Sequence, residues 1–347
     1  MARVDLTVRG GGIFGLSIAW EAVRRGAKVR LIETKAIGAG SSGGVVGALS
    51  PHVPENWNPK KAFQLDSLLM AEGWWAGVTA AGGVLPGYAR HGRLQPLADA
   101  AAVELARARA IHAQDLWRGQ AVWRVIPQLG VADSSGWAPI SPSGWLVYDD
   151  LSARIQPMAA CAALVAAIRS GGGEVIIAET VPDEGAVVWA TGLAGLEKLS
   201  TDLRRDVGGG VKGQALAVHF AAQNLPQMLV GGLHIVPHAD GTVAIGSTSE
   251  LAWQDGSAVD WQVNELFERA VTAVPVLAGA AVVTRWAAVR PRAKSRAPLL
   301  GAWPGRTGHF VANGGFKIGF GMAPKVADVM VDLVLDGHDN VPEGFRL

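Results

Sequence analysis

The first 33 residues alternate apolar and polar positions in a pattern that changes period twice. A short apolar run is followed by a glycine-rich turn, an amphipathic run and a second apolar run that ends at Glu33. Two short apolar runs around a helix-period segment predict a βαβ unit over about residues 3–33. Within it Gly10, Gly12 and Gly15 match G-x-G-x-x-G, and Glu33 follows after about 20 residues. In this context we favour a dinucleotide site over a purely structural βαβ turn.

Each of these residue types has a physical role in such a site. Gly10 permits the tight turn after the strand, Gly12 lets a pyrophosphate approach the backbone, and Gly15 lets the helix pack closely on the strand. The helix N-terminus offers free N–H groups to phosphate oxygens, and Glu33 is expected to accept hydrogen bonds from a ribose. Arg9 is unusual, because an apolar residue normally ends this strand, and it is expected to reach either solvent or a phosphate.

The chain then passes through mixed segments. Residues 35–53 are rich in Gly and Ser and form either a flexible linker or a backbone that lies close to a ligand, and the apolar residues among them argue against the linker. Helical patterns follow at 61–81 and 98–119, with a short strand pair between them at 88–97. A loop that leads into a helix is expected over 145–168, and strands over 174–181 and 186–193.

From about residue 207 the pattern favours antiparallel strands. These strands are expected over 211–220, 228–250 and 281–293, with a hairpin turn at His238–Gly241 and one helix at about Asp260–Val274. The end of the chain, 308–337, predicts a strand, a glycine-rich turn and a helix, which is the arrangement of the N-terminal unit again. The order therefore predicts an α/β fold of two domains, each assembled from separated pieces of chain.

Composition narrows the function classes. With 347 residues, 49% of them hydrophobic and 18% charged, the chain is expected to be globular, and a net charge of +1 favours neither nucleic acid nor a membrane surface. The single Cys161 excludes an internal disulfide, and we expect it to be a small buried apolar residue. No closely spaced set of His, Cys and acids predicts a metal site. Neither a secretory signal nor an apolar run long enough for a membrane span is apparent, so a cytoplasmic location is expected.

Several blocks of sequence together resemble the family of FAD-dependent amine oxidoreductases that includes D-amino-acid oxidase, glycine oxidase and sarcosine oxidase. The blocks are GGGIFG (10–15) with Glu33, GAGSSGGVVGAL (38–49), WATG (189–192), and the C-terminal pair RWAAVRPRAKSRAPLLG (285–301) and NGGFKIGFGMAP (313–324). VKGQAL and IVPHADGTVAIGSTSE resemble the substrate-domain strands of the family. The match covers nearly the whole chain in order.

The resemblance implies a Rossmann-like FAD domain with a parallel sheet and a substrate domain on a mixed or antiparallel sheet. The FAD domain is expected over 1–80, 145–205 and 285–347, and the substrate domain over 81–144 and 206–284. Since no His lies in 38–49 and Cys161 lies outside the C-terminal block, noncovalent FAD is expected. The implied FAD contacts are Gly10, Gly12, Ile13, Phe14, Gly15, Glu33, Lys35, Gly40, Ser41, Ser42, Gly43, Gly47, Ala48, Leu49, Val181, Ala190, Thr191, Gly192, Gly314, Gly315, Phe316, Lys317 and Ile318.

The activity implied is oxidation of the C–N bond of an amino acid or secondary amine. A hydride passes from the carbon next to the neutral amine to flavin N5, and water hydrolyses the resulting imine, so no general base is required. Oxygen or another acceptor would reoxidise the flavin, and an oligomer is compatible with the sequence. Three alternatives remain open: an amine dehydrogenase with a different acceptor, a nicotinamide-only dehydrogenase, and a flavin-binding subunit of a larger complex without turnover of its own.

Lys317, Arg290 and His52 are the candidate catalytic residues. Lys317 either binds a substrate carboxylate, as the resemblance implies, or is a solvated lysine at a helix start, where a cation opposes the helix dipole. Arg290 is the best candidate for bidentate carboxylate binding in a basic run that forms either a pocket wall for an anionic substrate or a solvated strand-and-loop face. His52 follows the second glycine block and either contacts flavin or substrate or is a loop histidine. His238 stands where relatives often have Arg, and its role is open.

Overall fold

The βαβ unit expected at the start of the chain is present. A computed structural model describes residues 4–130 and 136–347 of the protein. In it β1 (Leu6–Arg9) and β2 (Val29–Glu33) pair in parallel, with Leu6 opposite Val29, and α1 (Ile13–Arg24) connects them. Leu6, Val8 and Leu31 are fully buried, so the apolar runs are two interior strands of a covered sheet.

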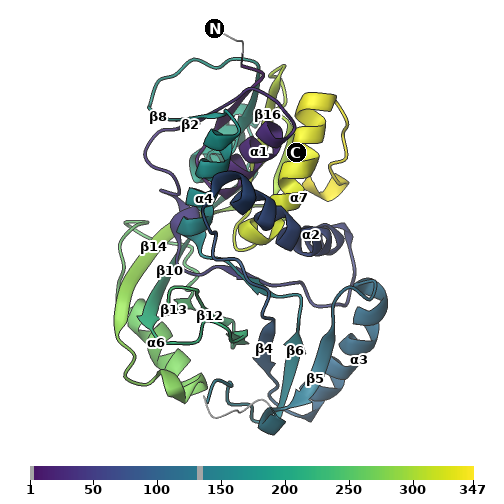
Figure 1. Ribbon diagram of the computed structural model, residues 1–347, viewed down its shortest axis with the longest axis vertical. Coiled ribbons are helices and arrows are strands. Elements are labelled where there is room, and N and C mark those ends of the chain that lie inside the picture. The colour runs from purple at the N-terminus through teal and green to yellow at the C-terminus, as the bar shows by residue number, and fades with distance from the viewer. Residues whose placement is uncertain (1–3, 131–135) are drawn as a thin grey trace.

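This sheet has six strands, which come from both ends of the chain and from its middle (Figure 1). Only the edge pair β15–β16 is antiparallel, and the other pairs are parallel. Parallel pairs with helical crossovers define an α/β unit, as predicted. The strand order is β15 (Leu299–Ala302), β16 (His309–Asn313), β9 (Ala186–Trp189), β1, β2 and β8 (Glu174–Ile177).

Helices from distant parts of the sequence cover one face of this sheet. The largest apolar core is built by α1 together with α2 (Pro59–Gly82), α4 (Pro157–Ser170) and α7 (Gly319–Val331). α2 begins where it does because the Asn58 side chain accepts a hydrogen bond from Lys61 N at 3.1 Å and Pro59 occupies the first turn. α5 (Gly192–Leu203) packs in a separate cluster with β15 and β16. Within the described residues, no helix combines the length and the apolar character that a bilayer crossing requires.

The second lobe is built on an eight-stranded sheet (Figure 1). Its pairs are antiparallel except for β4–β11. α6 (Gln262–Ala273) packs over β10, β12 and β13, and α3 (Ala100–Leu116) packs on β5. The order is β14 (Val282–Ala293), β10 (Gly208–His219), β13 (Thr242–Gly246), β12 (Leu233–Pro237), β11 (Gln227–Val230), β4 (Arg93–Pro96), β6 (Trp145–Asp149) and β5 (Trp123–Pro127). A short pair, β3 (Ala48–Leu49) and β7 (Ala153–Arg154), stands apart.

Most expected elements are confirmed, and two expectations are wrong. Residues 88–97 hold one strand rather than a strand pair, because β4 pairs with the distant β6 and β11. The segment 145–168 begins with strand β6 rather than a loop, because Trp145–Asp149 is enclosed between β4 and β5. The division into two domains stays a prediction. Sheet membership places β6 and all of β14 with the eight-stranded sheet, so we propose that the boundaries fall after β6 and after β14.

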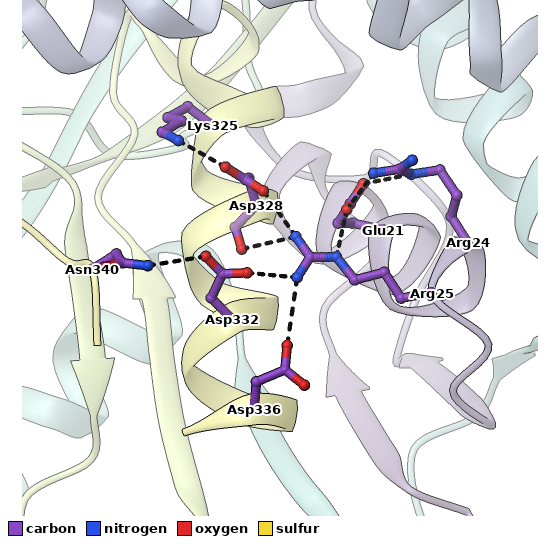
Figure 2. A network of polar contacts seen from close by, with 8 residues as sticks. All are labelled: Glu21, Arg24, Arg25, Lys325, Asp328, Asp332, Asp336 and Asn340. Carbon is purple, nitrogen blue, oxygen red and sulfur yellow. Dashed lines mark hydrogen bonds and ion pairs between the residues drawn. The ribbon is translucent and has the colours of Figure 1, made fainter. Parts of the chain in front are cut away.

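The first and last long helices are joined by one arginine. Arg25, at the end of α1, contacts Glu21 at 2.7 Å, Asp328 at 2.8 Å and Asp332 at 2.6 Å, and Asp336 lies 3.7 Å away (Figure 2). The three aspartates lie on α7 and on the turn of π-helix that follows it. Glu21 is 2% exposed, so its carboxylate depends on paired cations for compensation. The cluster fixes the end of α1 against α7.

Replacement of Arg25 by alanine should therefore destabilise the fold. Several carboxylates would be left close together with less compensation, and we expect a loss of about 2 kcal/mol in the free energy of unfolding. Arg24→Ala is the matched control, because Arg24 contacts only Glu21 in this cluster and its side chain is 55% exposed. We expect its loss to be under about 1 kcal/mol. Denaturant unfolding of both variants measures the difference, and equal losses would contradict the role of Arg25.

Candidate functional site

One cavity of about 590 Å³ is lined by both glycine-rich turns. Gly10 and Gly12, at the start of α1, contribute to it, and so do Gly315 and Lys317, which come before α7. Strands β12 and β14 of the eight-stranded sheet complete its wall with His234 and with Trp286, Val289 and Arg290. The cavity therefore lies where the two sheets meet, and it has a glycine-rich part and a part with basic side chains.

The N-terminal turn exposes backbone rather than side chains. Gly10 has φ of +111°, and a Cβ there would lie 2.4 Å from the carbonyl oxygen of Ala190. A Cβ on Gly15 would lie 2.0 Å from Gly10 O, so helix and strand touch through their backbones. Gly12 is the N-cap of α1 and has no side chain to cap it. The Ser42 hydroxyl instead accepts a hydrogen bond from Ile13 N at 2.9 Å, so the second glycine/serine block supports the helix start.

Glu33 and Arg9 flank this turn. Glu33 accepts hydrogen bonds from Gly11 N at 2.7 Å and from Lys35 N at 2.9 Å, and its side chain lines the cavity. Arg9 pairs with Asp183 at 2.7 Å and donates to the carbonyl oxygen of Val181 at 2.6 Å. Arg9 also lines the cavity, so the expectation that it reaches a phosphate stays a prediction. The carboxylate of Glu33 thus holds the glycine turn in shape from the edge of the cavity.

The C-terminal turn is fixed by its own polar contacts. Asn313 donates from Nδ2 to Gly192 O at 2.8 Å and accepts from Gly314 N at 2.7 Å. Phe316 N donates to Pro291 O at 3.0 Å, which ties the turn to β14. A Cβ on Gly315 would lie 2.8 Å from Cζ of Phe14, on the first turn of α1. The two turns, about 300 residues apart in the chain, are therefore neighbours in space.

The basic part of the cavity is centred on Arg290. Its guanidinium lies directly over Gly213 of the paired strand β10, where a Cβ would come within 1.6 Å of Nη1. Nη1 donates to Thr248 O at 3.3 Å, and the guanidinium lies 5.8 Å from the ring centroid of Trp286. Within the described residues Arg290 forms no ion pair with a carboxylate. A glycine in mid-strand thus creates the space in which this cation faces the cavity.

Burial shifts the pKa values of the three nitrogen-containing groups here. It lowers the pKa of Arg290 to about 10, although the charge of Glu250 opposes the shift. It lowers the pKa of Lys317, and the charge of Arg290 lowers it further. The pKa of His234 falls to about 4, through burial first and then through the charges of Arg93 and Lys317. Near neutral pH His234 is therefore uncharged, while Arg290 keeps its proton.

Most residues expected to contact a cofactor or substrate line this cavity. They are Gly10, Gly12, Ile13, Phe14, Glu33, Lys35, Gly40, Ser41, Ser42, Gly47, Ala48, Ala190, Thr191, Gly192, Gly315, Phe316, Lys317 and Arg290. The expected residues outside its lining are Gly15, Gly43, Leu49, Val181, Gly314, Ile318 and His52. His52 lies against α2, where its Nδ1 and its backbone N both contact Gln64 Oε1. The lining shows position only, and the roles of these residues stay predictions.

The sequence analysis missed five lining residues of the eight-stranded sheet region: His234, Ser247, Trp286, Val289 and Pro291. The alternation of side chains along a strand could have revealed one of them. Leu233 and Ile235 are buried in the core of that lobe, so His234 between them faces the opposite side of the sheet. The Nδ1 atom of His234 is buried without a hydrogen-bond partner among the described residues. His238, whose role was open, is buried and its Nε2 contacts Val45 O at 2.8 Å, which supports the second glycine block.

Comparison with known proteins agrees with this arrangement. Residues 5–333 match the family model described as FAD dependent oxidoreductase (DAO). A glycine oxidase of Geobacillus kaustophilus is 26% identical over 96% of this chain and 93% of its own length. A glycine oxidase of Pseudomonas putida is 33% identical, and that match spans 39% of each chain. The crystal structure of the Geobacillus kaustophilus glycine oxidase superimposes with a TM-score of 0.86 at 22% identity, over 100% of this chain and 99% of that one.

The two N-terminal glycines should respond differently to the same substitution. Gly10→Ala should destabilise the fold by about 2 kcal/mol, because it combines a positive φ with a backbone clash. Gly12→Ala, whose new methyl would lie 3.2 Å from Ser42 Oγ, should fold nearly normally but retain a dinucleotide cofactor about tenfold less well. Thermal unfolding without cofactor and titration with FAD measure the two effects. Full FAD affinity in Gly12→Ala would contradict a phosphate site at the start of α1.

Proposed function

The chain belongs to the DAO family of FAD-dependent oxidoreductases, and from this premise we propose that it oxidises the C–N bond of a primary or secondary amine that carries a carboxylate. The observation that carries the proposal is Arg290. It is a buried cation that faces the cavity without an ion pair among the described residues. An isolated buried charge is costly unless a ligand of opposite charge neutralises it. A substrate carboxylate supplies that charge.

The cavity suits FAD by its volume and by the chemistry of its lining. The volume of about 590 Å³ lies in the usual range for cofactor sites. At Gly10 and Gly12 no side chain stands between the backbone amides and the cavity, which suits a pyrophosphate. We assign the phosphates to the start of α1, the ribose to Glu33, and the flavin ring to the space between the second glycine block and residues 315–317. Because Cys161 is buried in α4, with its pKa raised to about 12 by burial, it is a poor nucleophile, and we propose noncovalent binding.

The chemistry that FAD would supply when bound is acceptance of a hydride from the carbon next to the amine; the resulting imine would be hydrolysed by water to a carbonyl compound and ammonia, or a primary amine where the substrate is a secondary amine. The protein positions the groups for that step. Arg290 holds the carboxylate through its planar guanidinium and so fixes the α-carbon at the flavin end of the cavity. The backbone amides of Gly315 and Lys317 and the start of α7 favour negative charge at the same end.

His234 and Lys317 complete this end of the cavity. His234 is uncharged near neutral pH, so it offers a hydrogen-bond donor or acceptor without adding a further positive charge. The lowered pKa of Lys317 means that it loses its charge at lower pH than an ordinary lysine. Carboxylate binding should therefore weaken as the pH rises through the Lys317 pKa, because one of the two cations is lost. Neither group is required as a general base for hydride transfer.

The first test asks whether an amine with a carboxylate reduces the protein's flavin. The purified protein should be yellow, and anaerobic addition of glycine or sarcosine should bleach its visible absorption, with the corresponding carbonyl product formed. N-Ethylmethylamine is the matched control, since it is a secondary amine without a carboxylate, and it should bleach the flavin at least about a hundredfold more slowly. Admission of air then distinguishes an oxidase, which regains its colour, from a dehydrogenase that needs another acceptor.

Three outcomes would contradict the proposal in whole or in part. A colourless protein that takes up no FAD would remove the cofactor from the chemistry. A fully loaded protein whose flavin no carboxylate-bearing amine reduces would favour a flavin-binding subunit without turnover of its own. Equal rates with sarcosine and N-ethylmethylamine would leave the redox chemistry in place and remove the carboxylate site.

A second test displaces the guanidinium of Arg290 without replacing the arginine itself. In Gly213→Ala the new methyl occupies the place of the guanidinium, which must shift because it is the more flexible group. We expect KM for a carboxylate substrate to rise about tenfold, with little change in flavin content. Gly209→Ala is the matched control on the same strand, since a Cβ there meets no atom within 4 Å. Equal KM values in the two variants would contradict carboxylate binding by Arg290.

A further inference from the structure

A second cavity of about 340 Å³ adjoins the first. Ser247 and Lys317 line both, so the two spaces meet at these side chains. The other walls are the Gly231–Gly232 turn between β11 and β12, the hydroxyl residues Thr248 and Ser249, and one face of α6. The cavity lies beside the part of the first cavity that contains Arg290 and therefore continues the proposed substrate site away from the glycine-rich turn of α1.

The lining of the second cavity is polar. On α6 it consists of Gln262, Glu265, Leu266 and Arg269. Among the described residues that line this space only Leu266 has an apolar side chain. A space of this kind does not favour an aliphatic or aromatic substituent, because its polar groups would lose water without gaining hydrogen bonds. It favours a substituent with several hydrogen-bond acceptors.

The charges of the lining side chains indicate that these hydrogen-bond acceptors are anionic. Lys317 and Arg269 contribute two positive charges and Glu265 one negative charge, which leaves one positive charge in excess. Arg269 donates from Nη2 to Gly231 O at 3.1 Å, and neither Arg269 nor Lys317 forms an ion pair within the part of the chain that the structure describes. Arg290 also repels the Lys317 charge, since it contributes to the lowered pKa of that lysine. One substrate carboxylate at Arg290 leaves the second cavity still positively charged.

We propose that the substrate is an amino acid with a second anionic group, and that this group binds in the second cavity to Lys317, Arg269 and the hydroxyl groups of Ser247 and Ser249. The inference rests on the proposed function, in which the first carboxylate binds Arg290. It extends that function by naming the class of substrate: acidic amino acids, or glycines with an acidic N-substituent. The exchange of water for charged hydrogen bonds at Arg269 and Lys317 then selects these compounds over their apolar analogues.

The test compares pairs of compounds that differ only in the second anionic group. Anaerobic flavin reduction is measured with N-(2-carboxyethyl)glycine against N-propylglycine, and with each enantiomer of glutamate against that of norvaline. Binding without reaction is measured with thiodiacetate against (methylthio)acetate, which keeps only one carboxylate, through the change that each causes in the flavin spectrum. We expect the acidic member of at least one reactive pair, and thiodiacetate, to be preferred about tenfold or more.

Two variants test whether the preference for the acidic compounds depends on Arg269. Arg269→Gln should reduce the ratio between acidic and apolar members about fivefold or more, because it removes the charge from α6 and keeps a hydrogen-bonding side chain. Arg285→Gln is the matched control, since Arg285 is an exposed arginine of β14 in the same lobe and lines neither cavity. Its ratio should stay within about twofold of the unmodified protein.

The outcomes separate this inference from the proposed function. If glycine or sarcosine reduces the flavin but apolar members equal the acidic ones, or if Arg269→Gln leaves the ratio unchanged, the second subsite is wrong and the proposed function stands. If no amine reduces the flavin, the proposed function falls. The thiodiacetate comparison then still decides whether the second cavity binds an anionic group.

Discussion

The structure depends on the close contact between the first and the last long helix of the chain. α1 and α7 pack against each other, and the Arg25 cluster holds one end of that contact. At the opposite end Phe14 meets the backbone of Gly315, so two glycine turns from the two ends of the sequence line one cavity. Without this contact each turn would be an isolated strand–turn–helix junction. With it, backbone amides from both ends can serve one extended cofactor.

The eight-stranded sheet contributes the buried guanidinium of the cavity. Arg290 lies on β14, and its guanidinium occupies the space above Gly213 on β10. Because β14 also receives a hydrogen bond at Pro291 from Phe316, the strand that carries the cation is tied to the turn at the flavin end. The proposed carboxylate site and the proposed flavin site are therefore built on the same short stretch of backbone, which favours a fixed distance between them.

The sequence alone was sufficient for features with a local signal. The spacing of Gly10, Gly12 and Gly15, the hairpin at His238–Gly241 and the terminal helix all follow from patterns within a few residues of each other. Residues that pair over long distances carried no such signal. β4 and β6 find their partners far along the chain, so the first was expected as half of a local pair and the second as a loop.

Site residues follow the same rule. His52 stands next to a glycine block in sequence, yet its ring contacts Gln64 on α2, because a helix that starts a few residues later packs over it. His234 and Ser247 reach the cavity only because β13 lies beside β10, the neighbour of β14, and β12 lies beside β13 in the folded sheet. That proximity is a property of strand order, which a single sequence does not encode locally. Gly213 is a third case. The need for a residue without a side chain at this position becomes apparent only when the Arg290 guanidinium is seen to occupy the space above it.

The position of α6 has a consequence for how this enzyme can diversify. The helix forms one wall of the second cavity and packs on the core of its own lobe through Val263, Leu266 and Ala270. The residues of α6 that line the second cavity therefore belong to a different segment of the chain from the two glycine turns. If the second cavity is the proposed subsite, substitutions on that face change which substrates bind and leave the residues around the proposed flavin site unchanged, so substrate choice and redox chemistry can evolve separately.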